Sequence, residues 1–411
     1  MGLGNTSVYA FAAHLAQWMP GLYDHEVDSD LPSATDLRPL ATFWEVREKV
    51  MRNYVFPIDD PRKLTYGAIR GMLASLDDPY SRFLTPEEYG DFSKEVEGAF
   101  EGIGIWLEQE KGDETKPARI VIMSIIPEGP AAKADLRPGD QILAVDDKPV
   151  AALTLQAAVS LMKGPSGTSV KLTLKRDGRA TPFDVSVVRM RIEAPNVETR
   201  VLPGDIGYLW LRAFSKQAER ETRQGLEKLL DQHVKGLVFD LSMDGGGLLE
   251  QAIGVSSLFF KDGPVVYVKE RGGQPQPYEA LPGAIVPGNL PMVVLVDTGT
   301  ASASEITAGC LQDRGRALVM GTHSFGKSKV QTVIKLNDDS ALILTTAVYL
   351  TPKMRDIGAW WPEDKTKKGL HPDLPLPEPD KNSGIKFEDW HKGNIDKAAA
   401  YLRQEVAQQQ Q

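Results

Sequence analysis

The chain has 411 residues, a formal net charge of −9 at pH 7, and a composition that is 42% hydrophobic and 25% charged. This length suits two or three domains, the apolar fraction excludes a disordered chain, and the acidic balance argues against a general nucleic-acid-binding protein. A single cysteine, Cys310, excludes an internal disulfide and a thiolate cluster for structural zinc.

Residues 1–39 are predicted to be an N-terminal segment and linker. Residues 8–13 form a short apolar patch without a basic flank, and Pro20 stops its extension. This patch fits neither a signal peptide nor a membrane span. We expect it to be the remnant of an anchor outside this chain or a partner-binding segment. Residues 24–39 are acidic and contain two prolines, which is typical of a linker.

Residues 40–97 are predicted to form a helical region. Apolar residues recur at three- and four-residue spacing from Phe43 to Tyr54 and again from Ile69 to Leu76. Thr85-Pro86-Glu87-Glu88 then marks another helix start. The simplest interpretation is a helical packing element.

Residues 98–190 have the pattern of a small β-rich module. Its first strand is led by a glycine-containing loop, with the residues Gly102, Ile103, Gly104 and Ile105. A strand at 120–122, a short helix at 131–134 and a second helix at 155–162 are expected to follow.

This order of elements resembles a PDZ domain. The resemblance implies that N–H groups of the Gly102–Ile105 loop receive the carboxylate of a protein C-terminus, while the bound peptide adds as a strand. Asp135 stands where such domains usually have glycine. The backbone of that turn is therefore in question.

From residue 191 to about 380 the pattern changes to alternating strands and helices. The expected elements are strands at 206–211, 236–241, 292–296 and 317–320 and a helix at 217–232. Such alternation predicts an α/β sheet with ligand sites near the strand ends. Gly245-Gly246-Gly247 follows one strand and permits close backbone approach to a substrate carbonyl. A phosphate loop is disfavoured because neither common phosphate-binding motif is present.

A nucleophilic serine is predicted after the buried run Met292–Val296. Residues 298–304 are small, and a helical pattern begins at Glu305. A serine at such a turn has an uncovered hydroxyl beside unpaired backbone N–H groups, which can stabilise an oxyanion. Ser302 is the candidate, and Ser304 is the alternative that better fits a helix turn.

The serine needs a base to take its proton. Of the six histidines, only His323 lies near this stretch, and no G-x-S-x-G motif accompanies them. Lys327 is the second candidate, because desolvation moves a lysine pKa from about 10.4 toward about 7–8, where a neutral amine accepts protons. Gln331 follows four positions later and is placed to orient that amine.

These residues resemble the serine/lysine C-terminal processing peptidases, also called tail-specific proteases. The matching motifs are Thr300-Ala301-Ser302-Ala303-Ser304-Glu305, Phe325-Gly326-Lys327 and Val330-Gln331. The resemblance implies that Ser302 is the nucleophile, Lys327 the general base and Gln331 the residue that orients the lysine. It assigns the oxyanion hole to the N–H groups of Gly246 and Ala303, with Gly247 as the alternative to Gly246, and it requires no metal or cofactor.

The glycine loop departs from the family motif Asp-Leu-Arg-x-Asn-Pro-Gly-Gly. Ser242 replaces the arginine, Asp244 the asparagine and Gly245 the proline. The loop thus loses a cation and a stiff residue. We expect it to be unformed at rest.

Three features follow the predicted site. Met354 occupies a position where the family usually has glycine, after Leu350-Thr351-Pro352. Trp360-Trp361 suggests either a contact surface or a pair that caps the core. Residues 395–406 are predicted to form an amphipathic helix, for dimerisation or for packing.

The sequence thus predicts an α+β multidomain protein. A PDZ-like β-rich domain (98–190) precedes an α/β, ClpP/crotonase-like peptidase core (191–380), and a C-terminal helix and tail (381–411) ends the chain. The predicted function is a serine endopeptidase that captures protein or peptide substrates by their free C-termini and cleaves them with a Ser/Lys dyad. The alternatives are a catalytically silent PDZ scaffold or adaptor, and acyl-CoA chemistry, for which a PDZ domain has no purpose.

The resemblance carries further expectations. It implies a periplasmic or otherwise extracytoplasmic location, with membrane association through a segment absent from this chain. It also implies a homo-oligomer that associates through the helical region. Together with the altered glycine loop, it suggests activation by an adaptor protein or by assembly.

Overall fold

The computed structural model describes residues 38–96, 99–110, 119–126, 129–151, 153, 155–193, 196–362, 364–378 and 387–409. The predictions for residues 1–37 lie outside the described residues. The chain divides into two compact units, residues 1–72 and 73–411. Within the described ranges, no helix combines the length and the apolar character needed to cross a membrane.

The predicted helical region contains three helices and one short strand. The helices are α2 (Arg38–Asn53), α3 (Arg62–Ala74) and α4 (Pro86–Val96), and the strand is β1 (Arg82–Leu84). A further short strand, β2 (Ala99–Gly102), follows this region. α4 begins where the sequence predicts. The hydroxyl of Thr85 accepts the Glu88 N–H at 3.3 Å, and the Thr85 N–H donates to the Glu88 carboxylate at 2.8 Å.

The PDZ-like module predicted at residues 98–190 contains a six-stranded antiparallel sheet. Its strands are β3 (Ile105–Glu110), β4 (Arg119–Ile125), β5 (Gln141–Val145), β6 (Lys148–Pro149), β7 (Ser169–Lys175) and β8 (Phe183–Val188). The helices are α5 (Pro130–Lys133) and α6 (Leu155–Met162). β2 pairs with β9 (Met190–Glu193), so the chain enters and leaves this domain through one antiparallel pair.

Asp135 adopts the backbone conformation of the glycine that it replaces. Its φ is +55°, in the left-handed region that L-residues rarely occupy. The carboxylate accepts hydrogen bonds from Arg137 at 3.0 Å and from Arg176 at 3.4 Å. Aspartate tolerates this region better than most residues, so the turn is retained.

The α/β core predicted at residues 191–380 is built on a six-stranded sheet in which only β10 is antiparallel to its neighbour. The strands, in spatial order, are β10 (Val197–Leu202), β11 (Ile206–Leu211), β12 (Gly236–Asp240), β15 (Met292–Val296), β16 (Leu318–Gly321) and β19 (Leu374–Pro375). All residues of β12 and β15 are buried, as expected for parallel strands covered on both faces.

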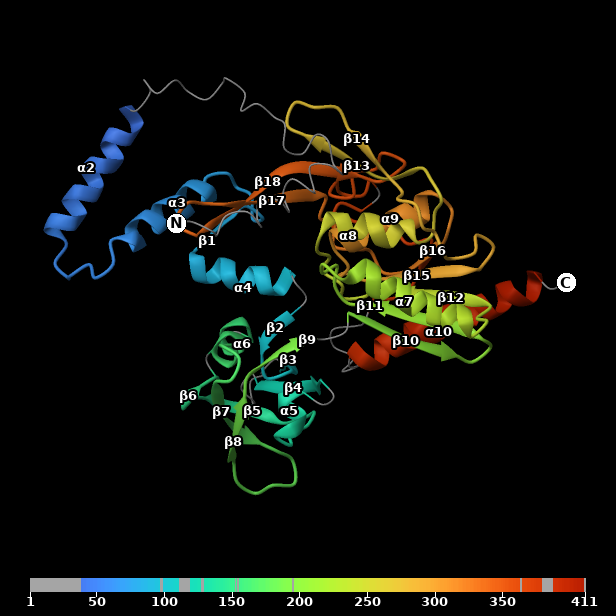
Figure 1. Ribbon diagram of the computed structural model, residues 1–411, viewed down its shortest axis with the longest axis horizontal. Helices are drawn as coiled ribbons and strands as arrows, with labels where there is room; N and C mark the ends of the chain where they lie inside the picture. Colours follow the sequence, from blue (N-terminus) through green and yellow to red (C-terminus); the bar gives the residue numbers. More distant parts are fainter. Residues whose placement is uncertain are drawn as a thin grey trace, which may run out of the picture. The chain divides into compact units, whose positions relative to one another are not determined.

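Helices cover both faces of this sheet (Figure 1). They are α7 (Ala218–Asp231), α8 (Leu249–Ser257), α9 (Ala303–Asp313) and α10 (Phe387–Gln409). Leu229 of α7 lies near Gly207, whereas Leu402 of α10 packs with Ile206 and Tyr208. Because side chains alternate along a strand, α7 and α10 lie on opposite faces. The predicted fold class is confirmed.

The C-terminal helix is longer than the predicted 395–406. α10 begins at Phe387, eight residues earlier, and continues to Gln409. Its apolar stripe from Ile395 to Leu402 is buried, as the periodicity indicates. The preceding turns bury polar residues, His391 and Asn394, which are 6% and 5% exposed. Hydrophobic periodicity cannot detect such turns.

A second, five-stranded antiparallel sheet completes the core. It consists of β1, β13 (Pro264–Glu270), β14 (Gln276–Glu279), β17 (Lys329–Lys335) and β18 (Ala341–Leu350). α9 contacts β13 of this sheet and β16 of the first. Trp360 is exposed, whereas Trp361 stacks on His371 at 4.4 Å, so the two tryptophans have different surroundings.

Candidate active site

Two loops at the carboxyl ends of neighbouring parallel strands form the site. Asp240 and Leu295 are paired in register, so the loops that follow β12 and β15 lie side by side. The Asp244 carbonyl accepts the Ala301 N–H and the Ser304 hydroxyl, each at 2.9 Å. The sequence-predicted alternative nucleophile, Ser304, is therefore fully buried and engaged in holding the two loops together.

Ser302 stands at the turn between β15 and α9, in a strained backbone conformation. Its φ and ψ are +56° and −116°, which a residue with a side chain rarely adopts. Three hydrogen bonds maintain it: the Ser302 N–H donates to Glu305 at 2.8 Å, and the Ser302 carbonyl accepts from Tyr349 at 3.0 Å and from Ile306 at 2.9 Å. Ser302 is thus held in this turn, and the residue remains partly exposed.

The glycine loop lies against this turn. A Cβ placed on Gly246 would lie 2.5 Å from the Ala301 carbonyl oxygen and 2.9 Å from the Ser302 Cβ, so only glycine fits there. The Gly246 N–H donates to the Asp244 carboxyl at 2.8 Å. In the described part of the chain, the N–H groups of Ala303 and Gly247 have no acceptor. They are unengaged donors of the nucleophile turn and of the glycine loop.

The structure differs from the expectation that this loop is unformed. The Met243 N–H donates to Asp297 at 2.9 Å, and the Gly246 carbonyl accepts the Phe214 N–H at 2.9 Å. Buried carboxyl groups and a backbone hydrogen bond therefore hold the loop, although it lacks the family's arginine and proline. Asp244 and Asp297 were not recognised as such anchors from the sequence.

Asp244 is completely buried with only one of its oxygens hydrogen-bonded. Burial raises the pKa of Asp244 to about 8, and the nearby carboxylate of Asp297 acts in the same direction. At neutral pH the side chain is therefore mostly protonated. A neutral carboxylic acid has nearly the shape of the asparagine that the family has at this position.

Lys327 lies in the loop after β16 and is half-buried. Burial lowers its pKa, and the positive charge of Arg82 lowers it further, while the carboxylates of Glu305 and Asp78 oppose this change. Its amine lies 4.9 Å from the ring centre of Tyr80. A lowered pKa favours the neutral amine that a general base requires.

The three predicted catalytic side chains are not hydrogen-bonded to one another. Across the described residues, no hydrogen bond joins the Lys327 amine to Ser302 or to Gln331. Gln331 lies on β17 and donates instead to the Thr345 hydroxyl at 3.3 Å. Catalytic hydrogen bonds often form only once substrate is bound.

Glu305 connects the serine and lysine segments, and the sequence analysis assigned it no role. Its carboxylate accepts the N–H groups of Ser302, Gly326 and Lys327 at 2.8, 2.7 and 2.9 Å, and the Ser324 hydroxyl as well. Burial raises the pKa of Glu305, and these four donors counteract that shift. The S-x-x-E spacing from Ser302 to Glu305 is the capping-box signal that predicts the first of these contacts.

The histidines considered as bases lie elsewhere. The Nδ1 atom of His323 is 2.8 Å from the Ser324 carbonyl oxygen. His391, on α10, contacts Asp240. Neither imidazole ring is hydrogen-bonded to Ser302.

The predicted peptide-binding loop joins β2 and β3 of the PDZ domain. Gly104 has φ +75°, in the region that favours glycine. The carbonyls of Ile103 and Gly104 accept the N–H groups of Ala131 and Ile126, each at 2.9 Å. Within the described residues, the N–H groups of Ile103 and Gly104 have no acceptor, so two donors are available at this loop.

Comparisons with known proteins agree with this architecture. Three family models match: "Peptidase family S41" over residues 205–376, "PDZ domain" over 121–176 and "Activating protease CtpB N-terminal domain" over 1–88. The carboxy-terminal-processing protease of Bartonella bacilliformis is 39% identical over 350 residues, which cover 83% of this chain and 76% of that protein.

Two further relatives are similar along most of the chain. The carboxyl-terminal-processing protease of Synechocystis sp. is 36% identical and aligns over 82% of this chain and 76% of its own length. A solved structure, the photosystem II D1 C-terminal processing protease, has a TM-score of 0.50 and 32% identity, and the match covers 82% of this chain and 86% of that one. The chain belongs to the carboxy-terminal-processing proteases of peptidase family S41, which are serine peptidases.

Proposed function

We propose that Ser302 is the nucleophile and Lys327 the general base of this peptidase. The observation that carries the assignment is the Glu305 carboxylate, which binds the backbone N–H groups of both residues. This contact fixes the strand-to-helix turn against the lysine loop. The burial that lowers the pKa of Lys327 supplies the second requirement, an amine that gives up its proton more readily and can then act as a base.

The reaction follows from these positions. Lys327 takes the proton of the Ser302 hydroxyl, whose oxygen attacks the carbonyl carbon of the peptide bond. The lysine then protonates the leaving amine, and water hydrolyses the acyl-enzyme. No cofactor is required for these steps. Gln331, four residues after the base, orients the amine once it turns from Thr345.

The negative charge on the carbonyl oxygen requires two N–H donors. Ala303 supplies one of them at the N-terminus of α9. The glycine loop supplies the other: the Gly246 N–H after release from Asp244, or the unengaged Gly247 N–H.

The PDZ domain selects the substrate in this proposal. The N–H groups at Gly102, Ile103, Gly104 and Ile105 receive the C-terminal carboxylate of a protein or peptide, and the peptide adds as a strand along β3. α6 packs against β3 and borders this position. The substrates are extracytoplasmic proteins, and an adaptor protein or homo-oligomerisation through the N-terminal helices raises the activity.

Single and double substitutions test the dyad. Ser302→Ala and Lys327→Ala should each reduce kcat by at least about 10⁴-fold, and the double variant should be no worse, because the two side chains act as a unit. Gln331→Ala should lose less. Cleavage of an unfolded protein such as casein measures these rates. Substantial turnover by Lys327→Ala would contradict the assignment.

A further inference from the structure

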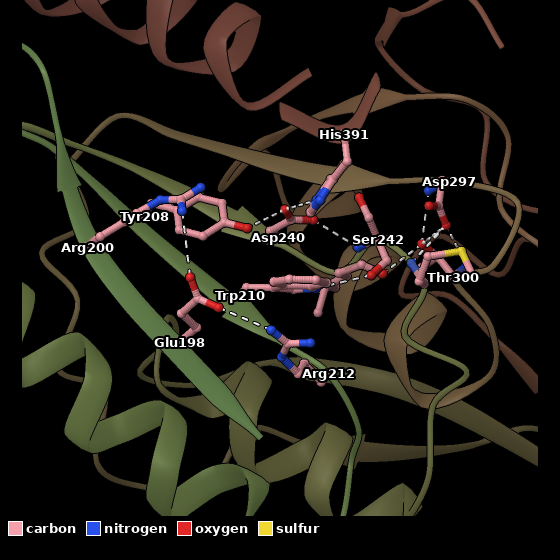
Figure 2. A network of polar contacts seen from close by, with 12 residues as sticks. Glu198, Arg200, Tyr208, Trp210, Arg212, Asp240, Ser242, Asp297, Thr300 and His391 are labelled. Carbon is pink, nitrogen blue, oxygen red and sulfur yellow. Dashed lines mark hydrogen bonds and ion pairs between the residues drawn. The ribbon is translucent and has the colours of Figure 1, made fainter. Parts of the chain in front are cut away.

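A buried carboxylate stands at the start of the glycine loop and takes no part in the proposed reaction. Asp240 is fully buried at the end of β12. One of its oxygens accepts the Tyr208 hydroxyl at 2.9 Å and lies 2.7 Å from the Nε2 atom of His391 on α10. Its other oxygen accepts the Ser242 N–H at 2.9 Å. Figure 2 shows these side chains converging on Asp240 from three elements.

The fold explains why these groups meet. Trp210 of β11 is paired with Asp240 of β12, and Tyr208 and Trp210 point to the same face of the sheet, which α10 covers. The indole ring of Trp210 lies 4.9 Å from the His391 ring and donates to the Ser242 carbonyl at 3.2 Å. Both backbone polar groups of Ser242 are thus held by this Asp240 cluster, comprising Tyr208, Trp210, Asp240 and His391.

Charged residues pack against Trp210 and pair with one another beside the Asp240 cluster (Figure 2). The Arg212 guanidinium lies 3.8 Å from the centre of the Trp210 ring and pairs with Glu198 at 3.1 Å. The second ion pair of Glu198, with Arg200, measures 3.6 Å. The indole that holds Ser242 is therefore packed between a histidine and an arginine.

Ser242 connects the cluster to the nucleophile turn. Two residues later, the Asp244 carbonyl holds Ala301 and Ser304, and Gly246 lies against Ser302. A displacement of Ser242 therefore changes the position of the glycine-loop N–H groups. Such groups must meet the oxyanion at hydrogen-bond distance, and loss of one donor typically lowers kcat by about 10²–10³-fold.

We infer that His391 is a positioning residue for the reaction: by holding Asp240, the C-terminal helix maintains the glycine loop in its catalytic geometry. The inference rests on the proposed role of that loop. A carboxylate is an acceptor, so His391 donates from Nε2. Removing this donor leaves a fully buried carboxylate with two partners, Tyr208 and the Ser242 N–H, and a buried charge that loses a partner forces local rearrangement.

Substitutions in the full chain test this inference. His391→Leu should lower kcat by about tenfold or more and change KM by less than about twofold, because the affected contact forms in the transition state. His391→Gln should restore most of kcat, since its amide nitrogen occupies nearly the position of Nε2. His391→Asn should not, because its side chain is one carbon shorter.

Leu402→Ala is the matched control. Leu402 is buried on the same helix and lies near Gly236, at the opposite end of β12 from Asp240. Its truncation weakens the docking of α10 without removing a hydrogen bond, so kcat should remain within about twofold of the unsubstituted value. Unfolding midpoints of all variants are measured in parallel.

Two results would overturn the inference. One is an equal loss of kcat in His391→Leu and Leu402→Ala at equal stability, which would make α10 only a structural support. The other is a failure of His391→Gln to exceed His391→Asn, a comparison that remains decisive if His391→Leu does not fold. Turnover that survives Ser302→Ala would instead contradict the proposed function, so the two failures are distinguishable.

Discussion

Three buried carboxyl groups near Ser302 differ in how well their oxygens are satisfied. Glu305 accepts four donors and Asp240 three, whereas one oxygen of Asp244 has no hydrogen-bond partner. Burial penalises a charged carboxylate, and donors offset that penalty. In Asp244, burial with an unpartnered oxygen raises the pKa to about 8.

Asp244→Asn should therefore change stability in a pH-dependent way. The folded-state pKa is about 8, whereas an unfolded aspartate titrates near about 3.9. The folded state binds the Asp244 proton more tightly than the unfolded state does. The contribution of the protonated carboxyl group to folding stability is therefore fully present below about pH 4 and is lost as pH rises through about 8. Asparagine does not titrate. The free energy of unfolding of Asp244→Asn, relative to that of the unsubstituted protein, should be higher at pH 8.5 than at pH 5 by at least about 1 kcal/mol.

Denaturant unfolding at the two pH values measures this gain. Asp177→Asn, at an exposed position, is the control and should show no such difference. An equal effect of Asp244→Asn at both pH values would mean that the carboxyl group is charged in the folded protein.

The base can be tested through its neighbour Arg82. Activity should rise with pH through the lowered pKa of Lys327, because only the neutral amine accepts a proton. Arg82→Ala removes a positive charge that disfavours protonation. It should shift the kcat/KM profile to higher pH, whereas Arg82→Lys should leave the profile nearly unchanged. Identical profiles for both variants would assign the titration to another group.

At the scale of elements, the sequence predicts β15, the turn and α9 well, because a buried apolar run is followed by small residues and then by a helical pattern. It also predicts β12 and the position of the glycine loop, but not the ordered state of that loop. Side-chain contacts between distant segments leave no such pattern. The four hydrogen bonds of Glu305 and the meeting of His391 with Asp240 depend on segments up to 151 residues apart. Periodicity and local motifs cannot reveal them.

Two turns keep a left-handed backbone conformation at a position where the family usually has glycine. Met354 and Asp135 both have positive φ, +61° and +55°. The left-handed region costs most residues about 1–2 kcal/mol, and Asp135 offsets this through Arg137 and Arg176. Met354→Gly should therefore stabilise the protein by about 1 kcal/mol. Asp135→Gly should be neutral or destabilising, because it loses those ion pairs. Thermal or denaturant unfolding of the two variants measures whether each substitution stabilises or destabilises the protein.

At the scale of the whole molecule, two functions belong to separate parts of one chain. The PDZ domain offers N–H donors at Ile103 and Gly104, and the peptidase core offers Ser302 beside Ala303. In the proposed function, both sites bind a negatively charged oxygen through unengaged backbone N–H groups. That oxygen belongs to a stable carboxylate at the PDZ loop and to a transient oxyanion beside Ser302. Backbone donors recognise the charge of a terminus more than any particular side chain. Specificity for a substrate's end is therefore expected to reside in the carboxylate itself.

Amidation of a peptide substrate tests this last point. It removes the charge and one acceptor oxygen, and a hydrogen bond to a charged group contributes about 1.5–3 kcal/mol, so binding should weaken by about ten- to a hundredfold. Binding is measured with the full-length Ser302→Ala variant, and cleavage with the active protein. Cleavage should fall strongly at low substrate concentration and less at saturation, because the contact precedes chemistry. Equal binding and equal cleavage of the acid and the amide would show that the Gly102–Ile105 loop does not recognise the terminus, and would leave this domain a role in gating or assembly.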